Sequence, residues 1–542
     1  MNKFWKSGDP FVWLTGGALA ASLLMILGLV LLILINGLGQ FWPDDLSEVI
    51  LKNDQKLLGE IWEREAIPSD AIAASDGIGH RIRMKIGNRD LYALDFRWVD
   101  ESDIARIERP ANALAMERIE WGNFYGYFKA VKMNDAIIES ALSSAWPRIQ
   151  TILGDMNDLR DQIREIEKDE IGAINYKIER HRLSIRKTEL QAKSEESTAR
   201  ITELQNQVRR LEDEYEIVEK RLESLSQKSR QYFLTMATAD GREKDINLFD
   251  VVRIYQPNSM NAFNKSGFYT SKVWEFVTGE PRESNTEGGI FPAIFGTVMM
   301  VMIMSIMVVP FGVVAAVYLR EYAKQGFFVR LVRIAVNNLA GVPSIVYGVF
   351  GLGFFIYAIG GTIDQLFYPE ALPTPTFGTG GILWASLTLS LLTVPVVIVA
   401  TEEGLAAVPR EIREGSLALA ATKFETLWRI VVPSAMPGIL TGLILAVARA
   451  AGEVAPLMIT GVVKLAPTLP LDSYFPFLHL ERKFMHLGFH IYDVGFQSPN
   501  VEAAIPMVYS TTLLLLLIVI FLNIFAIFIR NRLRKKLAYG VF

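Results

Sequence analysis

The chain contains no cysteine and only 5 histidines among its 542 residues. The lack of cysteine excludes disulfides, thiolate metal sites and cysteine nucleophiles, so any part outside the cytoplasm must fold without covalent cross-links. The sequence also has no G-x-x-x-x-G-K-[ST] loop, no His-Glu-x-x-His pair and no G-x-S-x-G motif. Three histidines, His479, His486 and His490, fall in one stretch, where we expect them at an interface or in solvent. We therefore expect no catalytic residue, no metal site, no cofactor and no enzymatic activity.

Neither sign of charge dominates the sequence, because the formal net charge is only -4. This balance gives no support to a nucleic-acid partner. Apolar sequence is abundant instead, with 51% hydrophobic residues beside 21% charged ones. Runs long enough to cross a hydrocarbon core, about 17–25 residues, lie at 12–35, 292–319, 339–360, 382–400, 438–463 and 505–529. We predict six membrane spans, of which the first is a retained anchor and not a cleaved signal.

Lysine and arginine gather at alternate connections between the spans. They occur at the start of the chain, at 320–333, at 410–429 and in the tail RNRLRKK, whereas 361–381 has none. Because cytoplasmic loops carry an excess of these residues, both termini are predicted to be cytoplasmic. Residues 36–290 are then predicted to lie outside, and the chain is predicted to be a multi-pass membrane protein.

The long segment 36–290 divides by pattern. About 75–135 and 231–256 have aromatic and β-branched residues around Gly-Asn or Asp-Gly turns, which predicts β-hairpins. Between them, about 150–230 predicts a coiled coil with a phase slip near Gly172. Its clearest heptad seam consists of Ile201, Leu204, Val208, Leu211, Tyr215, Val218, Leu222 and Leu225. An antiparallel hairpin with its tip near 192–199 is favoured over one long helix that pairs with another chain.

One amphipathic stretch, EGSLALAATKFETLWRIVVP at 414–433, separates two apolar runs. It resembles the EAA loop of ABC-importer permeases, a cytoplasmic helix pair with the pattern Glu-Ala-Ala, three residues, Gly, nine residues and Ile-x-Leu-Pro. The positions that match the pattern or replace its residues are Glu414, Gly415, Ser416, Ala420, Ile430, Val432 and Pro433. The replacements keep small residues small, so close helix packing is expected. Only the turn geometry stays open, because Ala420 stands where the pattern has glycine.

Further stretches extend this resemblance: GGIFPAIFGT at 288–297, NLAGVPSIVYGVFGLGFF at 338–355 and ARAAGEVAPLMITG at 448–461. Together they resemble the A-type permease subunits (PstA) of phosphate-specific ABC importers, over the first span and about 245–535. The resemblance implies a transport subunit that acts with a second, C-type permease, an ATPase dimer on separate chains, a periplasmic phosphate-binding protein and inorganic phosphate.

The implied fold is mainly α: a six-helix type I permease with an inserted periplasmic α+β domain that carries a long coiled-coil hairpin. Its parts are the start and first span at 1–35, the insertion at 36–290, a five-span core at 291–535 and a cytoplasmic tail at 536–542. The loop 401–437 would couple the core to the ATPase, with Glu414 facing ATPase cations and Ala418, Leu419 and Phe424 supplying packing area.

The fifth predicted span holds Arg449 and Glu453 one helical turn apart. If that helix starts near Gly438, Arg449 lies close to mid-bilayer, where a charge is costly unless it faces a partner or a watery path. A guanidinium also binds phosphate oxygens through a planar fork. We expect the pair in the translocation path, with a purely structural salt bridge as the alternative. Glu402 and Glu403, which end the fourth span, are expected to neutralise Arg413 or Arg449.

Within other spans, Pro343 and Pro395 are expected to permit kinks, and Gly348, Gly351 and Gly353 to let helices approach closely. Three functions remain open: a phosphate permease, a permease for another oxyanion such as sulfate or molybdate, and a membrane sensor that signals through its coiled coil. The sensor is the weakest, because the sequence has no cytoplasmic output domain.

Overall fold

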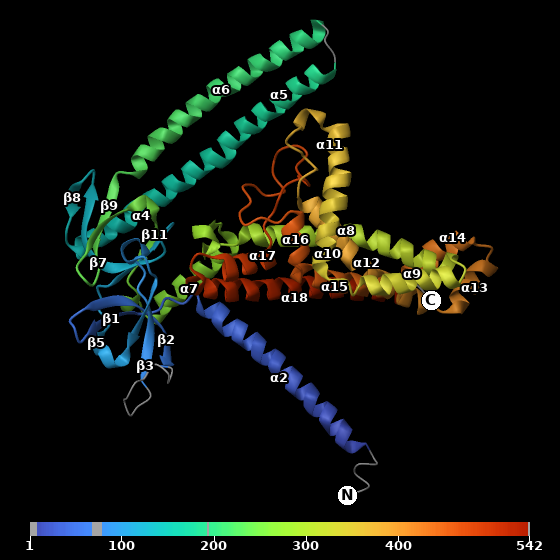
Figure 1. Cartoon of the computed structure of the whole chain (residues 1–542), viewed down its shortest axis with the longest axis horizontal. Coiled ribbons are helices and arrows are strands. Elements are labelled where there is room, and N and C mark those ends of the chain that lie inside the picture. The colour runs from blue at the N-terminus through green and yellow to red at the C-terminus, as the bar shows by residue number, and fades with distance from the viewer. Residues whose placement is uncertain (1–7, 68–78, 192–194, 540–542) are drawn as a thin grey trace. The chain divides into compact units, whose positions relative to one another are not determined.

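The computed structural model describes residues 8–67, 79–191 and 195–539 (Figure 1). These residues form two compact units. The first, which we call the helical unit, comprises Met1–Gln40, Phe276–Pro281 and Gly289–Phe542. The second, which we call the insert domain, comprises Phe41–Glu275 and Arg282–Gly288.

Six helices among the described residues are long and apolar enough to cross a membrane, which confirms the predicted number of spans. They are Pro10–Gly39, Phe291–Tyr322, Ser344–Phe367, Ile382–Ala406, Lys423–Gly452 and Val501–Lys535. The third and fifth spans have boundaries that differ from the predicted ones. The third span starts only after Pro343, which is the N-cap residue and therefore begins the helix instead of kinking it. The fifth starts at Lys423, well before Gly438, and ends at Gly452.

The helical unit contains a central bundle with short flanking helices (Figure 1). Its elements are α2 (Asp9–Gly39), α8 (Phe291–Val317), η7 (Tyr318–Tyr322), α9 (Phe327–Leu339), α10 (Ser344–Phe350), η8 (Gly351–Gly360), α11 (Gly361–Phe367), α12 (Ile382–Ala406), α13 (Arg410–Ala418), α14 (Lys423–Thr426), η10 (Leu427–Val431), α15 (Val432–Gly452), α16 (Ala455–Thr460), α17 (Leu487–Tyr492), η11 (Asp493–Gln497) and α18 (Val501–Tyr539). Pro395 lies inside α12, as expected.

Helix α12 is the centre of the bundle, because it packs against both α8 and α15 and most of its residues are buried. Two of its hydroxyls cross to α8: Ser386 donates to the carbonyl of Met300 at 3.3 Å, and Ser390 donates to that of Met304 at 3.1 Å. Such bonds satisfy polar groups inside an apolar bundle.

Two of the three glycines singled out in the third span lie at close helix contacts. A Cβ on Gly348 would come within 2.8 Å of the backbone of Pro456, and one on Gly351 within 2.3 Å of Thr388. A Cβ on Gly353 would meet open space, so this glycine does not lie at a close helix contact within the chain. The first two positions let α10 and η8 approach α16 and α12.

The insert domain is built on two antiparallel sheets. The first has the strand order β4-β3-β2-β1-β5 and the second β10-β9-β7-β6-β11, with β8 paired to β7. The strands are β1 (Leu46–Leu51), β2 (Lys56–Ala66), β3 (His80–Lys85), β4 (Phe96–Asp100), β5 (Ile104–Glu108), β6 (Leu114–Arg118), β7 (Phe124–Met133), β8 (Ala136–Glu139), β9 (Tyr232–Ala237), β10 (Glu243–Asn247) and β11 (Val251–Tyr255). Strands β1 and β2 precede the range in which strands were expected. Helix α7 (Ala262–Thr278) follows the second sheet along the chain.

A long helical arm extends from the second sheet (Figure 1). Helix α4 (Leu142–Glu165) packs on the sheet, and α5 (Ile171–Gln191) and α6 (Glu195–Ser229) lie side by side along the arm. At 1.5 Å per residue, α6 alone is about 50 Å long. The expected tip of the hairpin includes 192–194, which lie outside the described residues.

The heptad seam is buried within the arm itself. Ile174 and Ile178 of α5 form one apolar cluster with Val208 and Val218 of α6. Because α5 and α6 cover this seam between them, the seam gives no reason to expect pairing with a second arm. The predicted phase slip has a local cause: η3 (Ile166–Glu170) is a π-helical turn, which shifts the stripe between α4 and α5.

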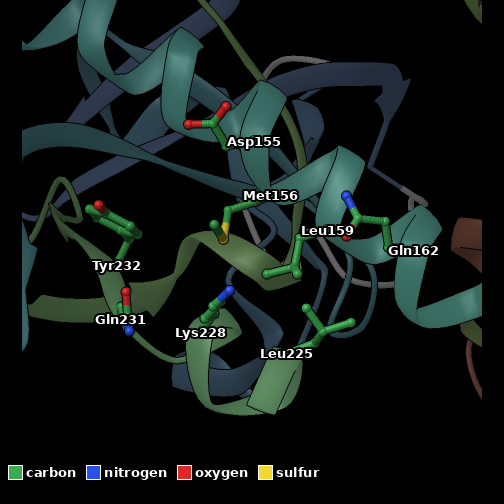
Figure 2. A pocket seen from close by; sticks show the side chains of 8 residues that line it. All are labelled: Asp155, Met156, Leu159, Gln162, Leu225, Lys228, Gln231 and Tyr232. Atoms are coloured by element: carbon green, nitrogen blue, oxygen red, sulfur yellow. The ribbon is translucent and has the colours of Figure 1, made fainter. Parts of the chain in front are cut away.

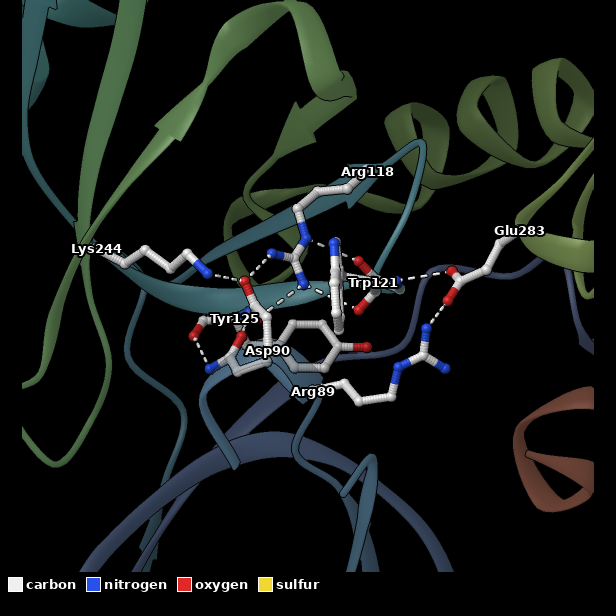
Figure 3. A network of polar contacts seen from close by, with 9 residues as sticks. Arg89, Asp90, Arg118, Trp121, Tyr125, Lys244 and Glu283 are labelled. Carbon is white, nitrogen blue, oxygen red and sulfur yellow. Dashed lines mark hydrogen bonds and ion pairs between the residues drawn. The ribbon is translucent and has the colours of Figure 1, made fainter. Parts of the chain in front are cut away.

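A buried polar network ties the short helix α3 (Arg89–Tyr92), which carries Asp90, to the second sheet of the insert domain (Figure 3). Arg118 on β6 forms two hydrogen bonds to Asp90, at 2.7 and 3.2 Å, and both side chains are more than nine-tenths buried. Lys244 on β10 also pairs with Asp90. Burial by itself would raise the pKa of Asp90, but hydrogen bonds and charge from Arg118 and Lys244 outweigh it and hold the pKa below its ordinary value.

Replacing this carboxylate should destabilise the insert domain. We expect Asp90→Asn to lower its free energy of unfolding by about 3–5 kcal/mol, because the change leaves buried Arg118 without its counter-charge. Because the pKa of Asp90 is lower in the folded state than in the unfolded chain, this contribution is present at neutral pH and should be lost as pH falls through the lowered pKa. Hydrogen exchange in residues 41–288 of the full-length chain measures the change. The control is Glu243→Gln, which removes an exposed partner of Lys129 at 3.8 Å and should change little; equal effects of both changes would contradict the prediction.

Candidate functional site

The loop 401–437 folds as two short helices joined by a tight turn. Helix α13 ends at Ala418, and α14 begins at Lys423, where Thr422 forms a capping box with Glu425. Buried Ser416 reaches across the pair to Thr426, with 2.9 Å between the two hydroxyl oxygens. The turn contains Ala420 with a φ of 62°, in the left-handed region that favours glycine. The replacement of the pattern's glycine therefore keeps the turn but adds strain.

Four apolar side chains of this loop are exposed, and we call them the docking patch: Leu417, Leu419, Phe424 and Trp428. Leu419 is 86% exposed, and the rings of Phe424 and Trp428 stack with centroids 6.3 Å apart. Glu414 and Gly415 lie exposed on α13, whereas Ile430 and Pro433 are half-buried where η10 passes into α15. The sequence pattern had identified Leu419 and Phe424 but missed Leu417 and Trp428.

Ion pairs tie the loop to the neighbouring helices. Arg413 donates to Glu321 in η7 at 2.5 Å, and Lys423 donates to the backbone carbonyl of the same residue. Glu402 accepts from Arg333 of α9 at 3.2 Å, so the expected pairing of Glu402 with Arg413 or Arg449 is wrong. Glu403 is exposed. A displacement of the loop would therefore reach η7, which follows α8, and the middle of α9 through these pairs.

Arg449 and Glu453 do form a pair, with 3.4 Å between Nε and Oε1. Arg449 lies in the last turn of α15 and Glu453 is its C-cap residue. The assumed helix start near Gly438 is wrong, because the helix begins earlier and Arg449 lies near its end; the position of Arg449 close to mid-bilayer stays a prediction. A cation in the last turn also interacts favourably with the C-terminal end of the helix dipole. The two side chains keep 31% and 21% of their surface exposed, so both are accessible to a further partner.

The turn of the loop offers a direct test of its strain. Ala420→Gly should raise the melting temperature of the purified chain, because it relieves a left-handed alanine by about 1 kcal/mol. The matched control is Ala418→Gly in the last turn of α13, which should cost about 0.5–1 kcal/mol. The melting temperature should therefore rise with Ala420→Gly and fall with Ala418→Gly. A loss of stability at both positions would show that Ala420 is not strained.

The three clustered histidines are buried, so the solvent-facing alternative is wrong, whereas a position at an interface stays a prediction. His479 lies between two carboxylates, with Nε2 3.0 Å from Asp472 and Nδ1 3.0 Å from Glu481. His486 caps α17, where its Nδ1 accepts from the backbone N–H of Gly488 at 3.1 Å. The carboxylates lie within ten residues of His479, but their pairing depends on the loop conformation and no sequence pattern indicates it.

A cavity of about 360 Å³ lies at the base of the arm in the insert domain (Figure 2). Its polar lining includes Asp155, Lys228 and Tyr232, and its apolar floor includes Met156 and Leu225. None of the site residues predicted from the sequence lines it. Among residues 8–67, 79–191 and 195–539, no group of three or more His, Asp or Glu residues is placed to hold a metal ion.

The chain matches the family model described as binding-protein-dependent transport system inner membrane component over residues 308–539. A phosphate transport system permease protein PstA from Yersinia pestis is 31% identical over 252 residues, which cover 46% of this chain and 75% of that protein. The PstA protein of Mycobacterium leprae is 39% identical over 196 residues, 36% of this chain and 59% of the relative. The match thus spans just over half the length of the mycobacterial relatives.

Two further proteins are similar to parts of the chain. The probable ABC transporter permease protein YqgI of Bacillus subtilis is 30% identical over 237 residues, covering 42% of this chain and 74% of that protein. Among solved structures, the MetNI methionine ABC transporter in inward-facing conformations aligns at 17% identity with a TM-score of 0.33, over 49% of this chain and 97% of that chain. The residues matched by the family model, 308–539, lie entirely within the helical unit.

Proposed function

We infer that this chain, which belongs to the binding-protein-dependent inner membrane transport components and within them to the PstA-type permeases, is one permease subunit of an ATP-driven phosphate importer. It is a multi-pass membrane protein. The observation that carries the proposal is the exposed docking patch, which lies on and beside a helix pair, α13 and α14, that Arg413 and Lys423 tie to Glu321 of η7.

In this proposal the docking patch sits in a groove on a separate ATPase subunit. Exposed leucine and aromatic side chains supply the apolar area typical of an interface centre, and Glu414 lies at its edge where it can meet a cation. Movement of the ATPase would pass through Arg413 and Glu321 to the end of α8. The chain itself hydrolyses no ATP.

The translocation path runs between this chain and a second, C-type permease, and phosphate is delivered by a periplasmic binding protein. Arg449 is proposed to contact phosphate, because its guanidinium is partly exposed and Glu453 occupies only one of its donors. Glu402 and Glu403 are proposed to line the path near its cytoplasmic end. We propose that both termini lie inside and the insert domain outside, which the distribution of lysine and arginine supports.

Uptake of labelled phosphate tests the proposal. A strain that lacks its own phosphate permeases, supplied with this chain and its partner subunits, should accumulate phosphate but not labelled sulfate. The same cells without this chain are the control. Uptake of sulfate or molybdate in place of phosphate would favour the alternative function, an importer of another oxyanion. No uptake of any oxyanion by an assembled complex would favour a sensor.

A further inference from the structure

A compact hairpin, residues 469–482, lies within the helical unit between α16 and α18. Its two sides pair through the backbone: the N–H of His479 donates to the carbonyl of Pro470 at 2.8 Å, and that of Asp472 donates to the carbonyl of Phe477 at 3.1 Å. Phe477 near the tip is 55% exposed and has a φ of 69°, a conformation that a bulky residue rarely adopts. Contacts elsewhere in the hairpin must therefore hold this strained tip in place.

Buried side chains supply those contacts, and we call them the His479 bridge. His479 is only 3% exposed, and both of its ring nitrogens face carboxylates: Nε2 lies 3.0 Å from Oδ1 of Asp472, and Nδ1 lies 3.0 Å from Oε1 of Glu481. Arg482 donates to the second oxygen of Asp472 at 2.5 Å and to the carbonyl of Leu469 at 2.8 Å. The bridge thus joins the two sides of the hairpin through one histidine between two acids.

The charge of His479 decides whether both of its contacts are favourable. An ionised carboxylate can only accept a hydrogen bond, and a neutral imidazole has a single N–H. A neutral His479 would therefore donate to one acid and turn a lone pair toward the other. The protonated ring has two N–H groups and a positive charge, so it satisfies Asp472 and Glu481 together.

The surroundings of the bridge keep its first acid ionised. Burial by itself would raise the pKa of Asp472, but hydrogen bonds from the backbone N–H of Tyr474 and from Arg482, with the charge of Arg482, hold the pKa below its ordinary value. Helix α12 packs on the hairpin through backbone bonds, in which the N–H of Ile382 donates to the carbonyl of Arg482 at 2.9 Å. The first turns of α12 carry no ionisable side chain, and Lys483 beside the bridge is exposed to solvent.

We propose that the His479 bridge is a pH-sensitive switch, which keeps the hairpin closed while His479 is protonated and lets it open when the proton leaves. Histidine ordinarily changes its charge between about pH 5 and 8. Loss of the proton leaves a nitrogen lone pair against a carboxylate, and the strain at Phe477 then favours another conformation of the tip. That the hairpin meets the external pH rests on the proposed function, in which this loop faces outside; the switch itself does not depend on transport.

Hydrogen exchange on the purified full-length chain tests the switch. Protection factors, which divide out the direct effect of pH on exchange, should fall about tenfold or more in peptides covering 469–482 between about pH 5.5 and 8, because a hydrogen bond to a charged group is lost. Peptides from the middle of α12 in the same sample are the internal control, and their protection should not change.

Three variants assign the effect to the bridge. Glu481→Gln should keep the hairpin protected at the higher pH, because its amide N–H can donate to Nδ1 of a neutral ring whose Nε2–H donates to Asp472. His479→Gln should give low protection that no longer depends on pH. His181→Gln is the matched control, since this histidine lies on α5 of the arm and its loss should leave the pH dependence intact.

Two results would overturn the inference: protection of the hairpin that does not change with pH in the unmodified chain, or the same fall with pH in Glu481→Gln as in the unmodified chain. Neither result bears on the proposed function, which the uptake of labelled phosphate tests separately.

Discussion

Arg449→Gln is expected to abolish most phosphate uptake while the protein accumulates at its normal level. The substitution keeps a hydrogen-bonding side chain of similar length but removes the charge that would bind phosphate oxygens. Charged hydrogen bonds contribute about 1.5–3 kcal/mol, which corresponds to a loss of roughly ten- to a hundredfold in kcat/KM. Initial rates of labelled phosphate uptake, together with the amount of protein in the membrane, measure the effect.

Two further variants separate a phosphate contact from a structural salt bridge. The double change Arg449→Gln with Glu453→Gln removes both partners of the 3.4 Å pair, so it should restore uptake only if the pair is structural. Arg530→Gln is the matched control, because this arginine of α18 contacts only the hydroxyl of Thr441, at 3.4 Å, among the contacts seen in residues 195–539. Recovery of uptake in the double variant would contradict the assignment of Arg449 to the path.

The second large effect is expected at the docking patch. Leu419→Ser combined with Phe424→Ser should release the ATPase from the purified complex, because both side chains are mostly exposed and would be buried only against a partner. Truncation of central interface residues typically costs at least about 2 kcal/mol, or roughly a thirtyfold rise in Kd. Co-purification of the ATPase with the tagged chain measures this loss.

Single charge reversal extends the same test. Glu414→Lys should weaken retention of the ATPase less than the double serine change, because an exposed charge at the edge of a patch mainly affects association and specificity. Phe263→Ser is the control: this side chain is 84% exposed but lies on α7 of the insert domain. Equal ATPase retention in all of these variants would show that the docking patch does not bind the ATPase.

The membrane spans could be predicted from the sequence because a bilayer core requires long apolar runs, and that requirement is local. Their ends could not. Pro343 lies within an apolar run but fixes the start of α10, and the polar residues from Lys423 onward hide the true beginning of the fifth helix. The same error placed Arg449 halfway along a span instead of in the last turn of α15.

In the insert domain too, features set by local residue spacing could be predicted, whereas features set by contacts between distant segments could not. Heptad spacing predicted a coiled coil, and the structure has the paired helices α5 and α6 in that range; the predicted phase slip near Gly172 lies beside the π-helical turn η3, which no sequence pattern indicated. Strands β1 and β2 escaped prediction although they form a hairpin, because the turn that joins them is marked only by Asn53 and Asp54 and not by a glycine. The buried surroundings of His479 and His490 also depend on how the loop folds back, which residue spacing does not encode.

The docking patch was only partly visible in the sequence. The spacing of Glu414, Ala420 and Pro433 indicated the loop, but the exposure of Trp428 could not be read from it, because an aromatic residue beside an apolar helix is more often buried. Ala420 illustrates the opposite case. Its replacement of glycine left the turn geometry open, and the left-handed φ of 62° shows that the turn persists despite the added strain.

Transport by purified components tests the central claim most directly. Proteoliposomes would contain the full chain with its second permease and ATPase, and would be supplied with the binding protein. The account predicts movement of labelled phosphate that requires both ATP and the binding protein, with sulfate transported poorly or not at all. An assembled complex that hydrolyses ATP but moves no phosphate, or that moves sulfate equally well, would contradict it.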